Sequence, residues 1–219
     1  KQNIYPGKMI VFEGLDGAGT TTQSRLLSSW LSENTNLPVF RTQEPTSGPI
    51  GALIRMALGG RLSLHPRTLA VLFAADRLDH LYSTEGVIEK LQDRTLVIMD
   101  RYYLSSWAYQ TLRMKDEEIE WLESLHEPCL EPDLTFYLDV PAHICMDRIT
   151  IKRKQQTEIF EKKNLLSNIE KQYNRAITQF VKRGEKIIIL DGTLPIESIH
   201  LAIIGHLKKM NFIPLGTRS

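Results

Sequence analysis

Five short apolar segments divide the sequence and constrain its fold more than any other feature. They are residues 9–12, 38–41, 95–99, 133–140 and 186–190. The intervening sequence has helical spacing of apolar residues, with helices expected at 20–30, 50–58, 66–90 and about 195–208. Strands that are apolar throughout are buried on both faces, and parallel strands are joined by helical crossovers. The alternation therefore predicts an α/β fold with a five-stranded parallel sheet and helices on both faces.

Polar clusters follow four of these segments. They are Glu13 to Gln23, Arg41 to Pro45, Asp100 with Arg101, and Asp191. In open parallel sheets, ligands bind beyond the carboxyl ends of the strands. We therefore expect the four clusters to meet at one edge of the sheet and to form one site.

The first cluster, EGLDGAGTTTQ, has the glycine spacing of a phosphate-binding loop. Glycines allow positive φ and bring backbone N–H groups close to an anion, and the following helix adds its positive dipole end. Thr21 takes the hydroxyl position that serves Mg²⁺. The predicted phosphate-binding residues are Gly14, Gly17, Ala18, Gly19, Thr20, Thr21 and Thr22. A purely structural turn is the alternative.

Thr20 stands where such loops usually carry a lysine. Losing one preorganised donor costs on the order of 10²–10³ in rate. An active enzyme would therefore need a compensating cation elsewhere. Residues 148–186 contain eleven Lys or Arg and four Asp or Glu, whereas the whole chain has a net charge of +1. This basic segment is the expected source of the cation, although a solvated helix face would have the same composition.

Composition excludes several protein classes. The chain has 219 residues, of which 42% are hydrophobic and 24% charged, as expected for one globular domain. No apolar run reaches the roughly 18 residues of a membrane helix. Two cysteines are too few for a disulfide framework. We expect a cytoplasmic protein that binds neither a membrane nor nucleic acid.

Several motifs in order resemble those of the thymidylate kinases. They are EGxDGxGxTTQ, QEPTSGPIG, LFAADR, DRYYLSSWAYQ and EPDLTFYLDV, and the resemblance runs from about Met9 to Gly192. It implies the three-layer P-loop kinase fold, with residues 1–219 as a single domain and a short basic lid at about 148–162. It also implies transfer of the ATP γ-phosphoryl group to dTMP with Mg²⁺, giving dTDP for dTTP synthesis, and a homodimer.

The catalytic residues expected under this resemblance are Asp100, Arg101, Asp16 and a cation in the lid. Asp100 ends an apolar strand and can hold Mg²⁺ or its waters together with Thr21. Arg101 can clamp the acceptor phosphate and the transferring group. Asp16 is expected to meet the 3′-hydroxyl of the sugar and a neighbouring arginine. An ordinary surface ion pair and a turn-capping Asp are the alternatives.

The acceptor site is expected on two helices. Phe73 and Arg77 lie four residues apart and share a helix face, so the ring can stack on a pyrimidine while the guanidinium donates to a base carbonyl. Arg55 is similar in position to the arginine that binds the monophosphate. The alternatives are a core phenylalanine and a solvent-facing arginine.

Further acceptor contacts are expected from Glu44, Ser105, Ser106, Tyr109 and Gln110. Glu44 is predicted to orient Arg101 or Asp16. Ser106 and Gln110 are four apart and both can face the base, while Tyr109 lies where the family places a ring against the sugar. An ordinary helix would hold the same residues.

The lid cation is predicted to be Arg153, with Arg148 as the second choice. Ala18 leaves the glycine loop without an arginine, which in this family is typical of members whose catalytic cation lies in the lid. The segment Asp191-Gly192-Thr193 is predicted to end the fifth strand and to cap the last helix. We also keep two other functions open: a deoxynucleoside kinase or another nucleoside monophosphate kinase, and a nucleotide-binding protein that has lost catalysis.

Overall fold

A computed structural model describes residues 1–153 and 159–213, without the side chains of 113, 116, 117, 150–153 and 159–163. Its centre is one sheet whose strands all run parallel, in the order β2-β3-β1-β4-β5. The strands are β1 (Lys8–Gly14), β2 (Val39–Gln43), β3 (Leu96–Asp100), β4 (Leu134–Asp139) and β5 (Ile187–Asp191). The predicted five-stranded parallel sheet is confirmed.

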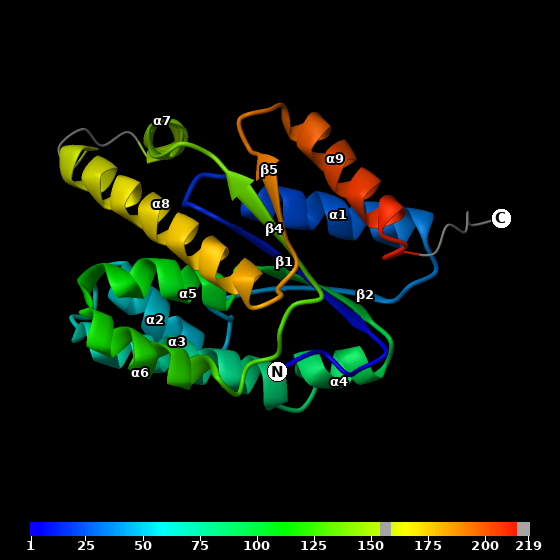
Figure 1. The fold of residues 1–219 in the computed structure, drawn as a ribbon, viewed down its shortest axis with the longest axis horizontal. Coiled ribbons are helices and arrows are strands. Elements are labelled where there is room, and N and C mark those ends of the chain that lie inside the picture. The colour runs from blue at the N-terminus through cyan, green and yellow to red at the C-terminus, as the bar shows by residue number, and fades with distance from the viewer. Residues whose placement is uncertain (154–158, 214–219) are drawn as a thin grey trace.

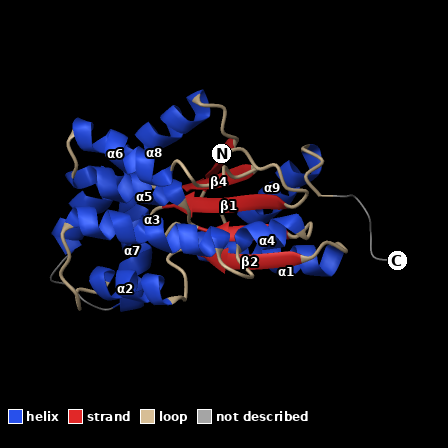
Figure 2. Cartoon of the chain, turned by 90° about the horizontal axis from the view of Figure 1, so that it is seen from below, coloured by secondary structure: helices blue, strands red, loops and turns tan. Residues whose placement is uncertain are grey.

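Helices cover both faces of this sheet (Figure 1). They are α1 (Thr20–Asn34), α2 (Pro49–Leu58), α3 (Pro66–Tyr82), α4 (Val87–Gln92), α5 (Tyr103–Gln110), α6 (Asp116–His126), α7 (Ala142–Arg153), α8 (Ile159–Lys182) and α9 (Ile196–Lys209), with a 3₁₀ turn at Thr111–Arg113. Helices α1 and α9 pack together on one face, and α4, α5 and α8 lie on the other. Figure 2 shows α2, α3, α5, α6 and α8 gathered at one end of the strands.

Strand β1 is central and the residues of its apolar part are buried on both sides, as the run MIVF predicts. It pairs with β3 so that Phe12 lies opposite Asp100, and with β4 so that Phe12 lies opposite Phe136. The rings of Phe12 and Phe136 stack with centroids 5.6 Å apart. This register brings the ends of β1 and β3 together, which places the glycine loop beside Asp100.

The single helix predicted for residues 66–90 is wrong. The structure has two helices, α3 and α4, separated at Ser83–Gly86. Glu85 has a φ of 61°, a left-handed conformation that no helix interior tolerates. A Cβ at position 86 would lie 2.7 Å from the carbonyl oxygen of Ser83, so only glycine fits there. None of the described helices combines the length and apolarity needed to cross a bilayer.

Candidate functional site

The glycine loop connects β1 to α1 and takes the conformation that its glycines predict. Gly17 has a φ of 89° and Gly19 a φ of 106°. A Cβ at position 17 would lie 2.8 Å from the carbonyl oxygen of Cys145, so both backbone angle and space require glycine. The loop is therefore shaped by its glycines before any ligand is considered.

Gly19 is also the N-cap of α1, and no side chain caps this end of the helix. The first N–H groups of an α-helix have no partner within the helix. The first turn of α1 carries no acidic residue, so its positive dipole end is not neutralised by its own sequence. This uncapped helix start is suited to bind an anion such as a phosphate.

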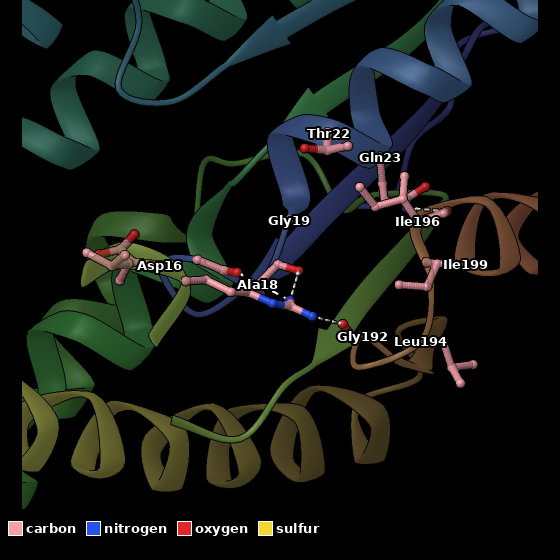
Figure 3. A pocket seen from close by; sticks show the side chains of 12 residues that line it. Asp16, Ala18, Gly19, Thr22, Gln23, Gly192, Leu194, Ile196 and Ile199 are labelled. Atoms are coloured by element: carbon pink, nitrogen blue, oxygen red, sulfur yellow. Dashed lines mark hydrogen bonds between the residues drawn. The ribbon is translucent and has the colours of Figure 1, made fainter. Parts of the chain in front are cut away.

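A cavity of about 630 Å³ opens in front of the loop. Figure 3 shows Asp16, Ala18 and Gly19 on one side of it, and Gly192 and Leu194 of the β5–α9 connection on the other. Its lining is charged and polar near the loop and becomes apolar at Leu194, Ile196 and Ile199. A phosphorylated ligand with a flat apolar part matches this gradient.

Arg148, on α7, is the described lid cation that reaches this cavity. Its guanidinium donates to the carbonyl oxygen of Gly192 at 3.0 Å and to those of Gly17 and Ala18 at 3.4 Å. Thr20 is buried in the loop and brings no charge. The side chain of Arg153 and residues 154–158 lie outside the described residues, so the choice of Arg153 stays a prediction.

Thr21 and Asp100 meet as the register of β1 and β3 dictates. The Thr21 hydroxyl donates to Oδ2 of Asp100 at 2.5 Å. The other carboxylate oxygen, Oδ1, is buried and has no hydrogen-bond partner among the described residues. A hydroxyl beside a carboxylate with one unused oxygen fits Mg²⁺, which binds through one or two carboxylates, waters and substrate phosphates. No group of three or more His, Cys, Asp or Glu in the described part of the chain offers a cage made only of protein ligands.

Arg101 follows directly after β3, and its backbone has a φ of 70°. This conformation turns the side chain back over the glycine loop. The guanidinium donates to the carbonyl oxygen of Gly14 at 2.8 Å and to the carboxylate of Asp16 at 2.9 Å. Burial opposes the charge, but the neighbouring Tyr109, Tyr173, Asp16 and Glu13 raise the pKa of Arg101 well above its ordinary value. The predicted contact of Asp16 with a neighbouring arginine is present, and the arginine is a permanent cation.

The acceptor side contains a buried ion pair instead of a free arginine. The side chains of Arg77 and Glu44 are 1% and 4% exposed, and their closest charged atoms lie 2.7 Å apart. Arg77 also donates to Ser106 at 2.9 Å and contacts Nδ1 of His126 at 3.0 Å. Burial and the charge of Arg77 hold the pKa of His126 well below its ordinary value, so the ring is neutral and accepts this hydrogen bond.

The prediction that Glu44 orients Arg101 or Asp16 is wrong. Its carboxylate binds Arg77 and lies 3.2 Å from His80, both on α3. Strand β3 separates β2 from the glycine loop after β1, and Arg101, which follows β3, turns back to Gly14 and Asp16 of that loop. The cap predicted for Asp191-Gly192-Thr193 is also wrong, because Pro195 is the N-cap of α9 and no side chain caps this helix; the Asp191 carboxylate accepts from Thr193 instead.

The remaining predicted acceptor residues lie on α2, α3 and α5. Phe73 is half-buried, one helical turn before Arg77. Gln110 is buried, and neither atom of its amide has a hydrogen-bond partner among the described residues. Tyr109 accepts a hydrogen bond from the N–H of Asp16 at 3.2 Å. Arg55 is exposed and donates to the carbonyl oxygens of Pro45 and Thr46, in the connection between β2 and α2.

Three residues in this region were not assigned a role from the sequence. Glu13 and Tyr173 contact the Arg101 segment, and His126 contacts Arg77. A charged residue inside the otherwise apolar run MIVFEG is a signal that could have singled out Glu13. Tyr173 and His126 lie on helices distant in sequence, and no local pattern distinguishes them from other helical residues.

Comparison with known proteins gives one consistent result. The family model described as thymidylate kinase matches residues 12–203. A probable thymidylate kinase of Methanocaldococcus jannaschii is 37% identical over 92% of this chain and 96% of its own length. Those of Methanococcus aeolicus and Thermococcus kodakarensis are 36% and 34% identical, over 94% and 92% of this chain and 98% and 97% of their own lengths.

Proposed function

The chain belongs to the thymidylate kinase family, and from this premise we propose that it transfers the γ-phosphoryl group of ATP to dTMP in the presence of Mg²⁺. It is a phosphotransferase. The observation that carries the proposal is the position of Arg101, whose guanidinium binds both the loop at Gly14 and the carboxylate of Asp16. A cation at this point lies between the phosphate-binding loop and the acceptor side.

The protein's part in this reaction is to position two nucleotides in line and to offset charge. The uncapped N–H groups at the start of α1 bind the donor phosphates, and the apolar end of the cavity takes the donor base. Arg101 binds the acceptor phosphate and stabilises charge as the phosphoryl group moves. Asp16 keeps Arg101 oriented and accepts from the 3′-hydroxyl of the acceptor sugar.

We propose that Thr21 and Asp100 hold Mg²⁺, directly or through its waters. The buried and unpartnered Oδ1 of Asp100 supports this assignment. Bound there, Mg²⁺ would supply positive charge to offset the negative charge of the donor phosphates. A cation of the lid, Arg153 or Arg148, takes the place of the loop lysine.

The contacts of Glu44 argue against the main alternative function, that of a deoxynucleoside kinase. A deoxynucleoside kinase needs a free carboxylate after β2 to accept the proton of a sugar hydroxyl. Glu44 is 4% exposed and is bound to Arg77 and His80, so it is not available as such a base. On the acceptor side, Phe73, Ser106 and the unpartnered amide of Gln110 support recognition of a pyrimidine base in a monophosphate.

A coupled assay with ATP tests the proposal. We expect turnover of dTMP to exceed that of dUMP, thymidine and dGMP, and we expect Arg101→Ala to abolish it. Arg183→Gln is the control, because Arg183 lies just after α8 and forms a partly exposed ion pair with Glu123 of α6. Preferred phosphorylation of thymidine would favour the deoxynucleoside kinase, and tight ATP binding without any turnover would favour the non-catalytic protein.

We further propose a cytoplasmic homodimer in which residues 1–219 form one domain. Exposed apolar side chains on α2 and α3, namely Leu53, Met56, Leu58 and Val71, support association because a second copy would cover them. Light scattering after size exclusion should give twice the mass of the 25.1 kDa chain. A monomeric mass at micromolar concentration would contradict this part of the proposal.

A further inference from the structure

Glu13 is the only carboxylate of β1, and it is buried with 0% of its surface exposed. It precedes the glycine loop directly but does not point into the cavity in front of that loop. Its side chain instead faces the segment that follows β3. A buried carboxylate is costly unless donors surround it, so its partners indicate its role.

The first partners of Glu13 are backbone groups at the start of α5. Its Oε1 accepts from the N–H of Tyr102 at 2.9 Å and from that of Ser105 at 3.1 Å. Tyr102 is the N-cap of α5, and no local side chain caps this helix. Glu13 of β1 therefore caps α5, although the two lie far apart in the sequence. Its negative charge lies at the positive end of the dipole of α5.

The second oxygen of Glu13 binds two hydroxyls that also touch Arg101. Oε2 accepts from the hydroxyl of Ser105 and from that of Tyr173 at 3.2 Å. The same two oxygens accept from the guanidinium of Arg101, at 3.2 Å for Ser105 and 3.3 Å for Tyr173. Each hydroxyl oxygen thus lies between Glu13 and Arg101, and the two hydroxyls also contact each other at 2.7 Å, where either can be the donor. The carboxylate aligns both hydroxyls so that their lone pairs face the guanidinium.

The backbone of Arg101 requires such support. Its φ of 70° is uncommon for a residue with a side chain, and such conformations persist only where the surroundings hold them. The N–H of Arg101 is bound to the carbonyl oxygen of Phe12, and the next N–H along the chain is bound to Glu13. Both acceptors belong to β1, so the turn that positions the side chain of Arg101 is hydrogen-bonded to the strand that precedes the glycine loop.

We propose that Glu13 is a positioning residue for the proposed phosphoryl transfer: it caps α5 from β1 and, through Ser105 and Tyr173, fixes the guanidinium of Arg101 over the glycine loop. This inference rests on the proposed function for its catalytic consequence but not for its structural one. Ionised Glu13 accepts four hydrogen bonds. A glutamine has one accepting oxygen and presents an N–H₂ group to two hydroxyls that now donate to the carboxylate.

The central test is Glu13→Gln assayed at pH 8 with dTMP and ATP. Misplacement of a catalytic group by about 1 Å can cost on the order of 10²-fold. We expect kcat to fall about 10- to 100-fold, while KM for ATP changes less than about threefold because the uncapped N–H groups of α1 are untouched. Thr35→Val is the control: Thr35 is buried and its hydroxyl binds the end of α1, away from Arg101.

A second readout does not depend on catalysis. Amide hydrogen exchange should become at least about tenfold faster at Tyr102 and Ser105 in Glu13→Gln, and should remain at the wild-type rate there in Thr35→Val. Tyr173→Phe is the second variant, useful if Glu13→Gln does not fold. It removes one hydroxyl between Glu13 and Arg101 and should lower kcat about three- to tenfold without changing KM for ATP.

Several outcomes would overturn the inference. These are wild-type kcat in both Glu13→Gln and Tyr173→Phe, or unchanged exchange at Tyr102 and Ser105 in Glu13→Gln. A fall in kcat of equal size in Thr35→Val would show that general loss of stability, and not the position of Arg101, is responsible. A wild-type protein that does not phosphorylate dTMP would refute the proposed function instead, and amide exchange would still decide the role of Glu13.

Discussion

Glu44→Gln should be one of the most destabilising single substitutions near the site. It leaves the charge of Arg77, which is 1% exposed, without an anionic partner. Three neutral acceptors remain: the amide oxygen at position 44, the hydroxyl of Ser106 and the ring of His126. Because the pKa of His126 is held well below its ordinary value, this ring adds no charge of its own at neutral pH.

The magnitude follows from the burial of both partners. Removing one member of a buried ion pair costs about 3–5 kcal/mol, because the other charge stays desolvated. For a chain of 219 residues, each kcal/mol lowers Tm by about 2–4 °C, so we expect a decrease of about 6–20 °C. Arg67→Gln is the matched control. Its ion pair with Glu118 is exposed on the arginine side by 60%, so the loss should stay below about 1 kcal/mol.

Denaturant unfolding gives the free energy of unfolding of each variant. The variants are Glu44→Gln, its control Arg67→Gln, Arg77→Met and the double variant Glu44→Gln/Arg77→Met. The double variant removes the buried charge, so its loss should be smaller than the sum of the two single losses by at least about 1 kcal/mol. Additive losses, or a loss below about 1 kcal/mol for Glu44→Gln, would refute the reasoning. Either result would mean that Arg77 reaches solvent or another anion when Glu44 is neutral.

Three further predictions concern the loop, the metal site and pH. Thr20→Lys should change kcat less than about tenfold if a lid cation replaces the missing lysine, and a gain of about 10²-fold in the coupled assay would show that none does. Thr21→Val should raise the Mg²⁺ concentration for half-maximal turnover about 10- to 100-fold, measured by Mg²⁺ titration. Burial raises the pKa of Glu13 from 4.5 to about 7. Between pH 4.5 and about 7 the folded state therefore binds a proton that the unfolded state does not, so the free energy of unfolding should fall as pH rises through this range. The pH slope of the unfolding free energy should be shallower in Glu13→Gln; an unchanged slope would assign the effect to Glu185, whose pKa burial also raises to about 7.

Much of the site could be predicted because its parts are local in the sequence. Glycines at 17 and 19 indicate that the loop needs positive φ angles there, and the structure has positive φ at both. Asp100 and Thr21 could be paired in advance because adjacent parallel strands place the residues that follow them at one edge. Their contact at 2.5 Å agrees with that expectation.

The errors arose where partners are distant in sequence. The sequence placed Glu44 after β2 but did not show that Arg101 turns back to Gly14 and Asp16, while the carboxylate of Glu44 meets Arg77 of α3. The break between α3 and α4 falls at Ser83–Gly86, which contains no apolar residue, whereas the apolar residues on either side of it have the spacing of one helix.

By itself, the amino-acid sequence determined the parallel sheet, the glycine loop and the family, because these depend on periodicity and on motifs a few residues long. Only the tertiary structure decided which donors surround each buried charge. Glu13 caps a helix that begins 90 positions later, and Arg77 takes its partners from β2–α2, α5 and α6. The physical reason is that a buried carboxylate or guanidinium needs hydrogen-bond partners, and these come from segments that only the folded chain brings together. No local sequence pattern predicts which segments those are.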